Sequence, residues 1–142
     1  MFPPFQTLKT VIPAFGFFSF NKYFMGSRKW YDYAFFNTIP ESQKSIAFEK
    51  FAVPESYKVS RELVLNSFSN INFKKPHEPI LFIGGSNDHI FPPSLTETIA
   101  SRYNGNAGRV DLKIFDGKSH FICGEPGWES VADYILNWYE KL

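Results

Sequence analysis

The chain has 142 residues, a formal net charge of +1 and 20% charged residues, a balance that excludes the basic surface by which proteins bind nucleic acid or anionic lipid. Aromatic residues make up 19% of the chain and are concentrated in its first third, more than one small core is expected to absorb. The single cysteine, Cys123, excludes an internal disulfide and a cysteine-based metal cluster.

Targeting features indicate a cytoplasmic protein. The apolar stretch from Val11 to Phe20 is broken by Pro13 and Gly16 and is shorter than the roughly 20 residues that cross a bilayer. No small-x-small cleavage site follows it, so a signal peptide is not expected. A single cysteine also fits a reducing compartment.

Residues 1–26 are expected to form an irregular, aromatic-rich segment. They contain three prolines and two glycines and show no sustained period of 3.6 or 2, so we expect at most a short helical turn there. Ser27 then stands where a helix N-cap is favoured and predicts a helix that runs to about Asn37.

Two further helices are expected, so that residues 27–70 form a small helical layer. Thr38 and Glu41 have the spacing of a capping box and predict a helix to about Phe51. Pro54 opens a third helix, along which one amphipathic stripe repeats at helical spacing. The stripe consists of Tyr57, Arg61, Val64 and Phe68.

The region 71–142 begins with a predicted buried strand. The unbroken apolar run from Ile80 to Ile83 stands between Pro79 and two glycines, which is typical of a strand buried on both faces inside a parallel sheet. Such a strand requires a neighbour on each side. In open parallel sheets, ligands and chemistry collect beyond the carboxyl ends of the strands.

The remaining elements complete a parallel β-α-β-α unit. A helix is expected from Pro93, with Leu95, Ile99 and Tyr103 on one face. Strict alternation over Val110–Phe115 predicts a strand with one wet face, near a sheet edge. An apolar stripe predicts a last helix from about Pro126. Because strand–helix–strand crossovers are right-handed, both strands point the same way and their following loops open on one side.

Those two loops carry Asp88 and His120. A carboxylate that accepts a hydrogen bond from one imidazole nitrogen leaves the other nitrogen free to take a proton from a hydroxyl. His120 is thus the candidate general base and Asp88 its orienting acid. Taken singly, Asp88 is more often a turn former and a loop histidine is usually solvated. His89 is expected to point away from Asp88, and His77 lies in the linker before the strand.

The sequence here resembles the C-terminal half of an α/β-hydrolase superfamily member with its helical cap. The acid loop of that family resembles Gly85–Pro92, and its histidine loop resembles Gly117–Phe121. The resemblance implies the acid role for Asp88, the base role for His120 and a cap over residues 27–70. It implies a partial α/β-hydrolase fold, an esterase- or lipase-like activity, and neither a cofactor nor a metal.

The chain departs from the family in its nucleophile. The family carries a Gly-x-Ser-x-Gly elbow ahead of the acid and the histidine, and no such pattern occurs in this sequence. Ser86 is too near Asp88, Ser119 adjoins His120 and Ser27 stands at a helix start. We therefore expect a truncated or split hydrolase whose nucleophile lies elsewhere, and we expect the 142-residue chain alone to be inactive.

The expected substrate is a small, apolar, ester-like molecule. The candidate substrate contacts are Trp30, Phe35, Phe36, Ile90 and Phe121. The alternative is that these aromatic side chains pack the helical layer onto its own core.

Two other interpretations remain open. The chain is a non-catalytic remnant that binds a partner chain, such as a missing N-terminal half, or self-associates through its aromatic face. Alternatively, Asp88, His89 and His120 hold a metal, although they lack a closed ligand spacing. A haloperoxidase-like enzyme or a C–C bond hydrolase would share the same sequence features.

Overall fold

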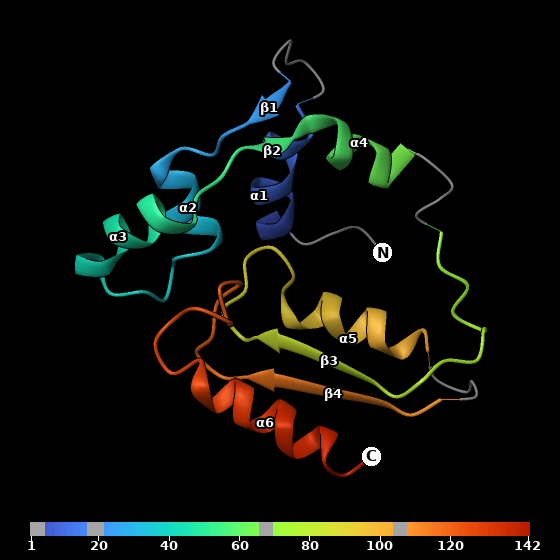
Figure 1. The fold of residues 1–142 in the computed structure, drawn as a ribbon. Helices are drawn as coiled ribbons and strands as arrows, with labels where there is room; N and C mark the ends of the chain where they lie inside the picture. Colours follow the sequence, from blue (N-terminus) through green and yellow to red (C-terminus); the bar gives the residue numbers. More distant parts are fainter. Residues whose placement is uncertain (1–4, 17–21, 66–69, 104–107) are drawn as a thin grey trace.

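A computed structural model describes residues 5–16, 22–65, 70–103 and 108–142. Four helices and a two-stranded antiparallel ladder form a helical layer, which lies over a unit of two parallel strands flanked by two helices (Figure 1). The general α/β class predicted from the sequence is therefore confirmed.

The helical layer is built from short elements. Its helices are α1 (Phe5–Phe15), α2 (Arg28–Ala34), α3 (Glu41–Phe51) and α4 (Tyr57–Leu65), and its strands are β1 (Tyr23–Phe24) and β2 (Glu55–Ser56). The two strands pair antiparallel, so the start of α4 lies beside Lys22, whose carbonyl accepts the Tyr57 N–H at 3.4 Å. The sequence pattern did not indicate this ladder, because two residues are too few to show a period of 2.

Helix α1 corrects the expectation that the first 26 residues are irregular. Its buried side chains are Thr7 and Thr10, whereas Phe5, Leu8 and Ile12 are exposed. An amphipathic helix usually has the opposite arrangement, with the apolar stripe facing the core. The apolar residues do recur at helical spacing, but their stripe faces outward, and the expectation of an irregular segment gave too much weight to Pro13 and Gly16.

The predicted helix starts have different outcomes. The Ser27 side chain accepts a hydrogen bond from the backbone N–H of Trp30 at 3.2 Å, which confirms this N-cap. The capping box at Thr38 is wrong, since α3 begins after Pro40 without a side-chain cap and the Thr38 hydroxyl bonds Glu125 instead. Helix α4 begins at Tyr57 rather than Pro54, and Phe68 lies outside the described residues.

A cluster of aromatic side chains forms the core of the helical layer. Tyr31 and Phe36 stack with their ring centroids 5.7 Å apart, and Phe121 meets Phe36 edge to face at 5.4 Å. Ile39 and Ala47 complete the buried cluster. Because Phe121 follows His120 in the chain, this packing anchors the segment after β4 to the helical layer.

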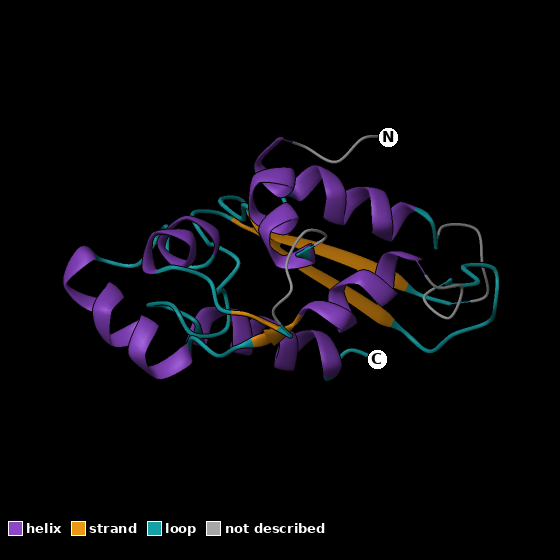
Figure 2. Ribbon diagram, turned by 90° about the horizontal axis from the view of Figure 1, so that it is seen from above, coloured by secondary structure: helices purple, strands orange, loops and turns teal. Residues whose placement is uncertain are grey.

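The unit of two parallel strands and two helices follows the predicted order of elements. Its elements are β3 (Ile80–Gly85), α5 (Pro93–Ser101), β4 (Val110–Phe115) and α6 (Glu129–Tyr139). The strands are parallel, and their register runs from Ile80 beside Val110 to Gly85 beside Phe115. Helices α5 and α6 lie on opposite sides of the two strands (Figures 1 and 2).

Strand β3 is less buried than its sequence predicts. Within the described ranges it pairs with β4 alone, and its apolar residues 80–83 are only half-buried. Its second neighbour, which the apolar run requires, is not among the described residues. One edge of β3 thus keeps backbone N–H and C=O groups without sheet partners in this part of the chain.

Strand β4 does not have the predicted wet face. Leu112 is its exposed residue, at 37% of its surface, while Asp111 and Lys113 are half-buried under α6. The indole N–H of Trp138 donates to the Asp111 carboxylate at 2.6 Å, and the Lys113 ammonium lies 5.6 Å from the Tyr134 ring centroid. Helix α6 covers the polar face because its aromatic side chains offer these groups specific partners.

The apolar stripe of α6 is largely exposed. Val131 is its buried member. The exposed residues along and beside the helix are Trp128, Ile135, Leu136, Tyr139 and Leu142. No described helix combines the length and the apolar character needed to traverse a lipid bilayer.

We predict that Trp138→Phe raises the pKa of Asp111. The hydrogen bond from the Trp138 N–H, which is the largest single cause, and the hydrogen bond and charge of Arg109 hold that pKa below its usual value. A carboxyl group whose pKa is lowered in the folded state stabilises the fold at pH values above its unfolded-state pKa of about 3.9. This stabilisation is lost as the pH falls through the lower folded-state value. The variant should therefore lose less stability below about pH 4, and a carboxyl NMR titration measures the pKa directly.

The matched control is Trp128→Phe, which changes an exposed indole and should leave the pKa of Asp111 unchanged. An unchanged pKa in Trp138→Phe would contradict the role of the indole hydrogen bond.

Candidate active site

The loops that follow β3 and β4 are held together at the carboxyl ends of the strands. These are the β3–α5 loop (residues 86–92) and the β4–α6 loop (residues 116–128). The Asn87 N–H donates to the Lys118 carbonyl at 2.8 Å, which extends the contacts of the sheet into the loops. A Cβ atom on Gly85 would lie 2.2 Å from that Lys118 oxygen. The glycine therefore permits the close approach of the two loops.

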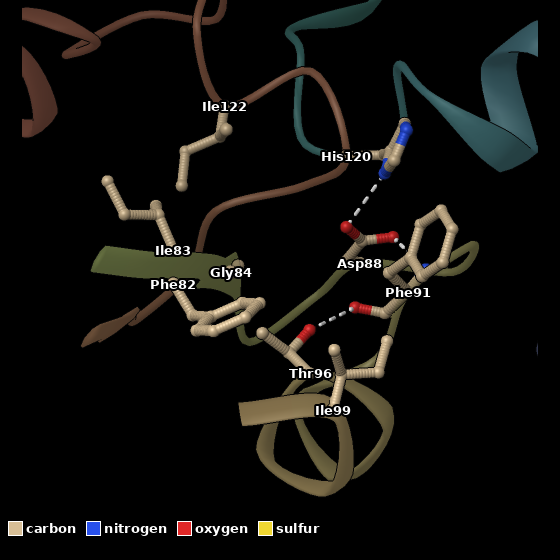
Figure 3. A pocket seen from close by; sticks show the side chains of 10 residues that line it. Phe82, Ile83, Gly84, Asp88, Phe91, Thr96, Ile99, His120 and Ile122 are labelled. Carbon is tan, nitrogen blue, oxygen red and sulfur yellow. Dashed lines mark hydrogen bonds and ion pairs between the residues drawn. The ribbon is translucent and has the colours of Figure 1, made fainter. Parts of the chain in front are cut away.

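Asp88 and His120, the two residues predicted to meet, lie in contact at this rim (Figure 3). Asp88 is buried, with 6% of its surface exposed, and its Oδ2 accepts a hydrogen bond from His120 Nδ1 at 2.8 Å. Its Oδ1 accepts the backbone N–H groups of Ile90 and Phe91 at 2.7 and 2.8 Å. Asp88 is thus a turn former and a histidine partner at once.

The geometry determines which nitrogen of neutral His120 carries the proton. An ionised carboxylate only accepts hydrogen bonds, so Nδ1 must be the protonated nitrogen facing Asp88. The lone pair then lies on Nε2, for which no hydrogen-bond partner is found among the described residues. A neutral imidazole in this state is able to accept a proton from a hydroxyl.

Two aromatic rings restrain the His120 side chain. Phe91 stacks on it with centroids 5.7 Å apart and planes at 25°, and Phe35 meets it edge to face at 5.1 Å. Phe91 belongs to the β3–α5 loop and Phe35 follows α2, so both parts of the molecule contact the ring. The role of Phe91 was not anticipated from the sequence, where nothing separates it from the many other phenylalanines.

A buried carboxylate, also not anticipated, ties the β4–α6 loop to the helical layer. Glu125 is 2% exposed; its Oε1 accepts the Ser119 N–H at 3.0 Å, and its Oε2 accepts the hydroxyls of Ser119 and Thr38. The Ser119 hydroxyl also lies 2.9 Å from the Phe35 carbonyl. No sequence signal marks Glu125, because its burial depends on Thr38, 87 positions away.

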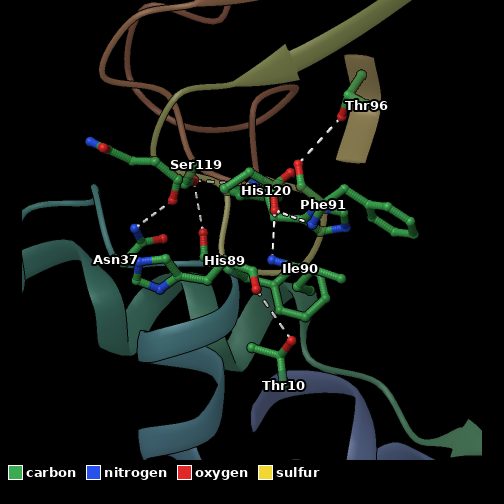
Figure 4. Close-up of polar contacts among 12 residues, drawn as sticks. Thr10, Asn37, His89, Ile90, Phe91, Thr96, Ser119 and His120 are labelled. Atoms are coloured by element: carbon green, nitrogen blue, oxygen red, sulfur yellow. Dashed lines mark hydrogen bonds and ion pairs between the residues drawn. The ribbon is translucent and has the colours of Figure 1, made fainter. Parts of the chain in front are cut away.

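The helical layer also holds the β3–α5 loop (Figure 4). Asn37 Nδ2 donates to the Asn87 carbonyl at 2.9 Å, and the Thr10 hydroxyl reaches the His89 carbonyl at 3.4 Å. His89 Nδ1 lies 2.7 Å from the Tyr33 carbonyl, so this nitrogen must be protonated. These contacts arise from three separate parts of the helical layer and restrain the loop on both sides of Asp88.

The position of His89 argues against the metal interpretation. Its ring packs on Tyr33 with centroids 4.5 Å apart, as expected for a side chain that points away from Asp88. Among the described residues, no three His, Cys, Asp or Glu side chains form a group able to hold a metal ion.

The candidate nucleophiles of this chain are engaged elsewhere. The Ser119 hydroxyl is fully buried in the Glu125 network, and the Ser86 hydroxyl donates to Asp116 Oδ1 at 3.0 Å. Ser27 caps α2. Within the described ranges, none of these three hydroxyls bonds His120 Nε2.

One cavity is lined by the pair, and a second is lined by residues that contact His120. The first, of about 240 Å³, is lined by Asp88, His120 and residues from both faces of β3, including Phe82 and Ile83 (Figure 3). Since neighbouring residues of a strand point to opposite faces, this cavity must reach around an edge of β3. Strand β4 occupies the other edge, so the cavity lies along the unpaired one.

The second cavity, of about 440 Å³, lies between the helical layer and the β3–α5 loop. It is lined by three of the candidate substrate contacts, namely Trp30, Phe35 and Ile90. The structure corrects the prediction that Phe36 contacts the substrate, because this side chain is 1% exposed and packs within the core of the helical layer. Phe121 lines neither cavity and packs against Phe36 and Phe51.

Comparison with known proteins does not assign the chain to a family. No protein-family model matches the chain, and a search of curated proteins finds no match either.

We predict that Gly85→Ala disrupts the contact between the two loops, whereas Gly84→Ala is tolerated. A Cβ atom at position 85 would collide with backbone of the β4–α6 loop, while one at position 84 would meet the flexible end of Ile114 at 3.1 Å. Amide NMR spectra should show large changes at Asp88 and His120 for the first variant only. Similar spectra for both variants would contradict the stated role of Gly85.

We predict that Glu125→Ala lowers the free energy of unfolding by about 1–3 kcal/mol, because it leaves buried donors on Ser119 and Thr38 without an acceptor. Denaturant unfolding measures the loss. The exposed Glu129 provides a matched control, since Glu129→Ala should change stability by less than about 0.5 kcal/mol. Equal effects of the two variants would contradict the network.

Proposed function

We propose that this chain supplies the acid and the histidine of a serine-type α/β-hydrolase that acts on an apolar ester. The observation that carries the proposal is the 2.8 Å contact between Asp88 Oδ2 and His120 Nδ1, with Nε2 left available at the carboxyl ends of two parallel strands. Ligands and chemistry collect at this end of open parallel sheets.

The proposed reaction assigns one role to each residue. A hydroxyl nucleophile gives its proton to His120 Nε2 as its oxygen attacks the ester carbonyl. Asp88 stabilises the imidazolium that forms, and Nε2 then returns the proton to the departing alcohol. A water molecule repeats the sequence to release the acid. The aromatic rings of Phe35 and Phe91 keep the imidazole in one orientation during both steps.

The nucleophile in this proposal comes from a segment outside the 142 residues. The sequence holds no Gly-x-Ser-x-Gly pattern, and the hydroxyls of Ser86 and Ser119 have other partners. The free edge of β3 and the cavity of about 240 Å³ beside it would receive a further strand that carries the nucleophile. In this proposal the helical layer is the cap of the hydrolase.

The apolar substrate is supported by the second cavity. Trp30, Phe35 and Ile90 line it, and the Phe35 ring also contacts His120. An acyl or alcohol group in this cavity would place its ester bond near the imidazole. Ligand sites of this kind are mostly apolar, with a few polar groups that orient the ligand.

A second candidate function is a non-catalytic chain that associates with a partner. The exposed apolar residues of α6, together with the free edge of β3, favour it. Size-exclusion chromatography with light scattering separates the two: a defined, soluble dimer of the 142-residue chain supports this candidate.

We predict that the 142-residue chain alone does not hydrolyse p-nitrophenyl esters. The protein encoded by the full reading frame that contains it should hydrolyse them, because that frame would add the nucleophile. His120→Ala and Asp88→Asn should lower kcat of that protein at least about a thousandfold. His77→Ala and Asp116→Asn are the matched controls, since neither residue contacts the Asp88–His120 pair.

Three results would contradict the proposal. The first is turnover by the 142-residue chain that disappears in His120→Ala, since the nucleophile would then lie within it. The second is a full reading frame without a nucleophile elbow. The third is turnover by the complete protein that persists in both site variants.

A further inference from the structure

The cavity of about 440 Å³, which we call the aromatic pocket, is walled by most elements of the helical layer. Its aromatic lining residues are Phe15, Phe24, Trp30, Tyr31, Phe35 and Phe91. They come from α1, β1, the α2 region and the β3–α5 loop. One wall is therefore shared with the Asp88–His120 pair, through Phe35 and Phe91.

Several rings of the aromatic pocket contact one another. Phe24 meets Trp30 at 86° with centroids 5.0 Å apart, and Tyr31 meets Trp30 at 89° and 5.1 Å. The Phe35 ring is tilted by 58° to Trp30 and by 31° to Tyr31. Aromatic faces arranged around a group attract a cation through their quadrupoles, which is how proteins recognise quaternary ammonium ions.

One carboxylate lies in the lining. Glu55 of β2 is exposed, and within the described ranges its side chain forms no ion pair or hydrogen bond. Glu55 pairs with Phe24 across the β1–β2 ladder, so both side chains lie on the same face of it. Burial, and after it the negative charge of Glu55, raise the pKa of the Tyr31 hydroxyl. β2 lies on the side of the helical layer remote from β3 (Figure 1).

The cationic side chains of the adjoining helices are engaged elsewhere. Arg61 donates to the Gly16 carbonyl at 3.1 Å, and Lys58 pairs with Glu62 at 3.7 Å. The Lys9 ammonium lies 3.7 Å from the Tyr33 ring centroid, and Tyr33 is not a lining residue. Among the described residues of α1 and α4, none therefore neutralises Glu55 through an ion pair.

We propose that the aromatic pocket binds an organic ammonium group, with Glu55 as its counter-ion. A purely aliphatic ligand would gain nothing from the carboxylate. A small inorganic cation would have to exchange its hydration for the few side-chain oxygens of a mostly aromatic lining, those of Thr10, Tyr31, Glu55 and Ser60. An alkylammonium ion combines apolar surface with a charge, so it matches both features of the lining.

The position of the pocket extends the proposed function. A substrate with its ammonium group toward Glu55 and its ester toward Phe35 would present the carbonyl to His120. The substrate class is then an ester of a cationic amino alcohol or a cationic acid. This extension rests on the proposed hydrolase, whereas binding of the ammonium group does not.

The test compares two ligands of equal shape that differ in charge. Choline and its carbon isostere 3,3-dimethylbutan-1-ol are titrated into the 142-residue chain, and amide NMR shifts give each Kd and locate the site. Choline should bind about tenfold more tightly than the alcohol, with the largest shifts at Ala14, Trp30 and Ile90. Glu55→Gln should remove most of this preference, while the exposed Glu49→Gln should keep it.

The outcomes are distinct. Equal affinities would overturn the proposal and identify a plain apolar cavity. A preference that survives Glu55→Gln in full would overturn the proposed role of Glu55 as counter-ion and leave the aromatic faces as the source of the preference. Absence of shifts at saturating choline would overturn the proposal as well. Because Glu55 is exposed, Glu55→Gln is expected to fold, which its unperturbed spectrum outside the pocket verifies. None of these results depends on ester hydrolysis, so the two proposals fail separately.

Discussion

The parallel pairing of β3 with β4 is the constraint on which the site depends. It brings two loops of the chain to the same rim, and the missing side chain of Gly85 lets the backbone at Lys118 approach closely. The hydrogen bond between Asp88 and His120 follows from this geometry, because each residue lies a few positions beyond its strand. In a right-handed β-α-β unit the loops after the two parallel strands open on the same side of the sheet, so the two residues lie close together.

The helical layer restrains the two loops and the orientation of the His120 imidazole. Glu125 binds the β4–α6 loop to Thr38, and Asn37 binds the backbone of the β3–α5 loop. The Glu125 contacts with Ser119 satisfy buried polar groups that would otherwise carry a desolvation cost, whereas the Asn37 bond is exposed. The same layer supplies Phe35, whose ring contacts His120. The imidazole is thus restrained by the Asp88 carboxylate at Nδ1, by the stacked ring of Phe91 and by the edge-to-face ring of Phe35.

The aromatic residues serve several purposes. Tyr31, Phe36 and Phe121 pack the helical layer against the β4–α6 loop. A second set, to which Tyr31 also belongs, lines the aromatic pocket. Trp128 and Tyr139 lie exposed at α6. Packing explains the first set fully, since these rings meet at ordinary centroid distances.

The sequence by itself determined the elements whose signals are local: the apolar strand β3, the alternating strand β4, the Ser27 cap, and the positions of Asp88 and His120 beyond the strands. Their catalytic roles stay predictions. Tertiary structure alone decided which faces are buried. Thr7 and Thr10 face inward on α1, Asp111 lies under Trp138, and the Thr38 hydroxyl serves Glu125 instead of its own helix. The reason is physical: a side chain's burial and hydrogen bonds depend on groups that are distant in sequence, and a local pattern carries no information about them.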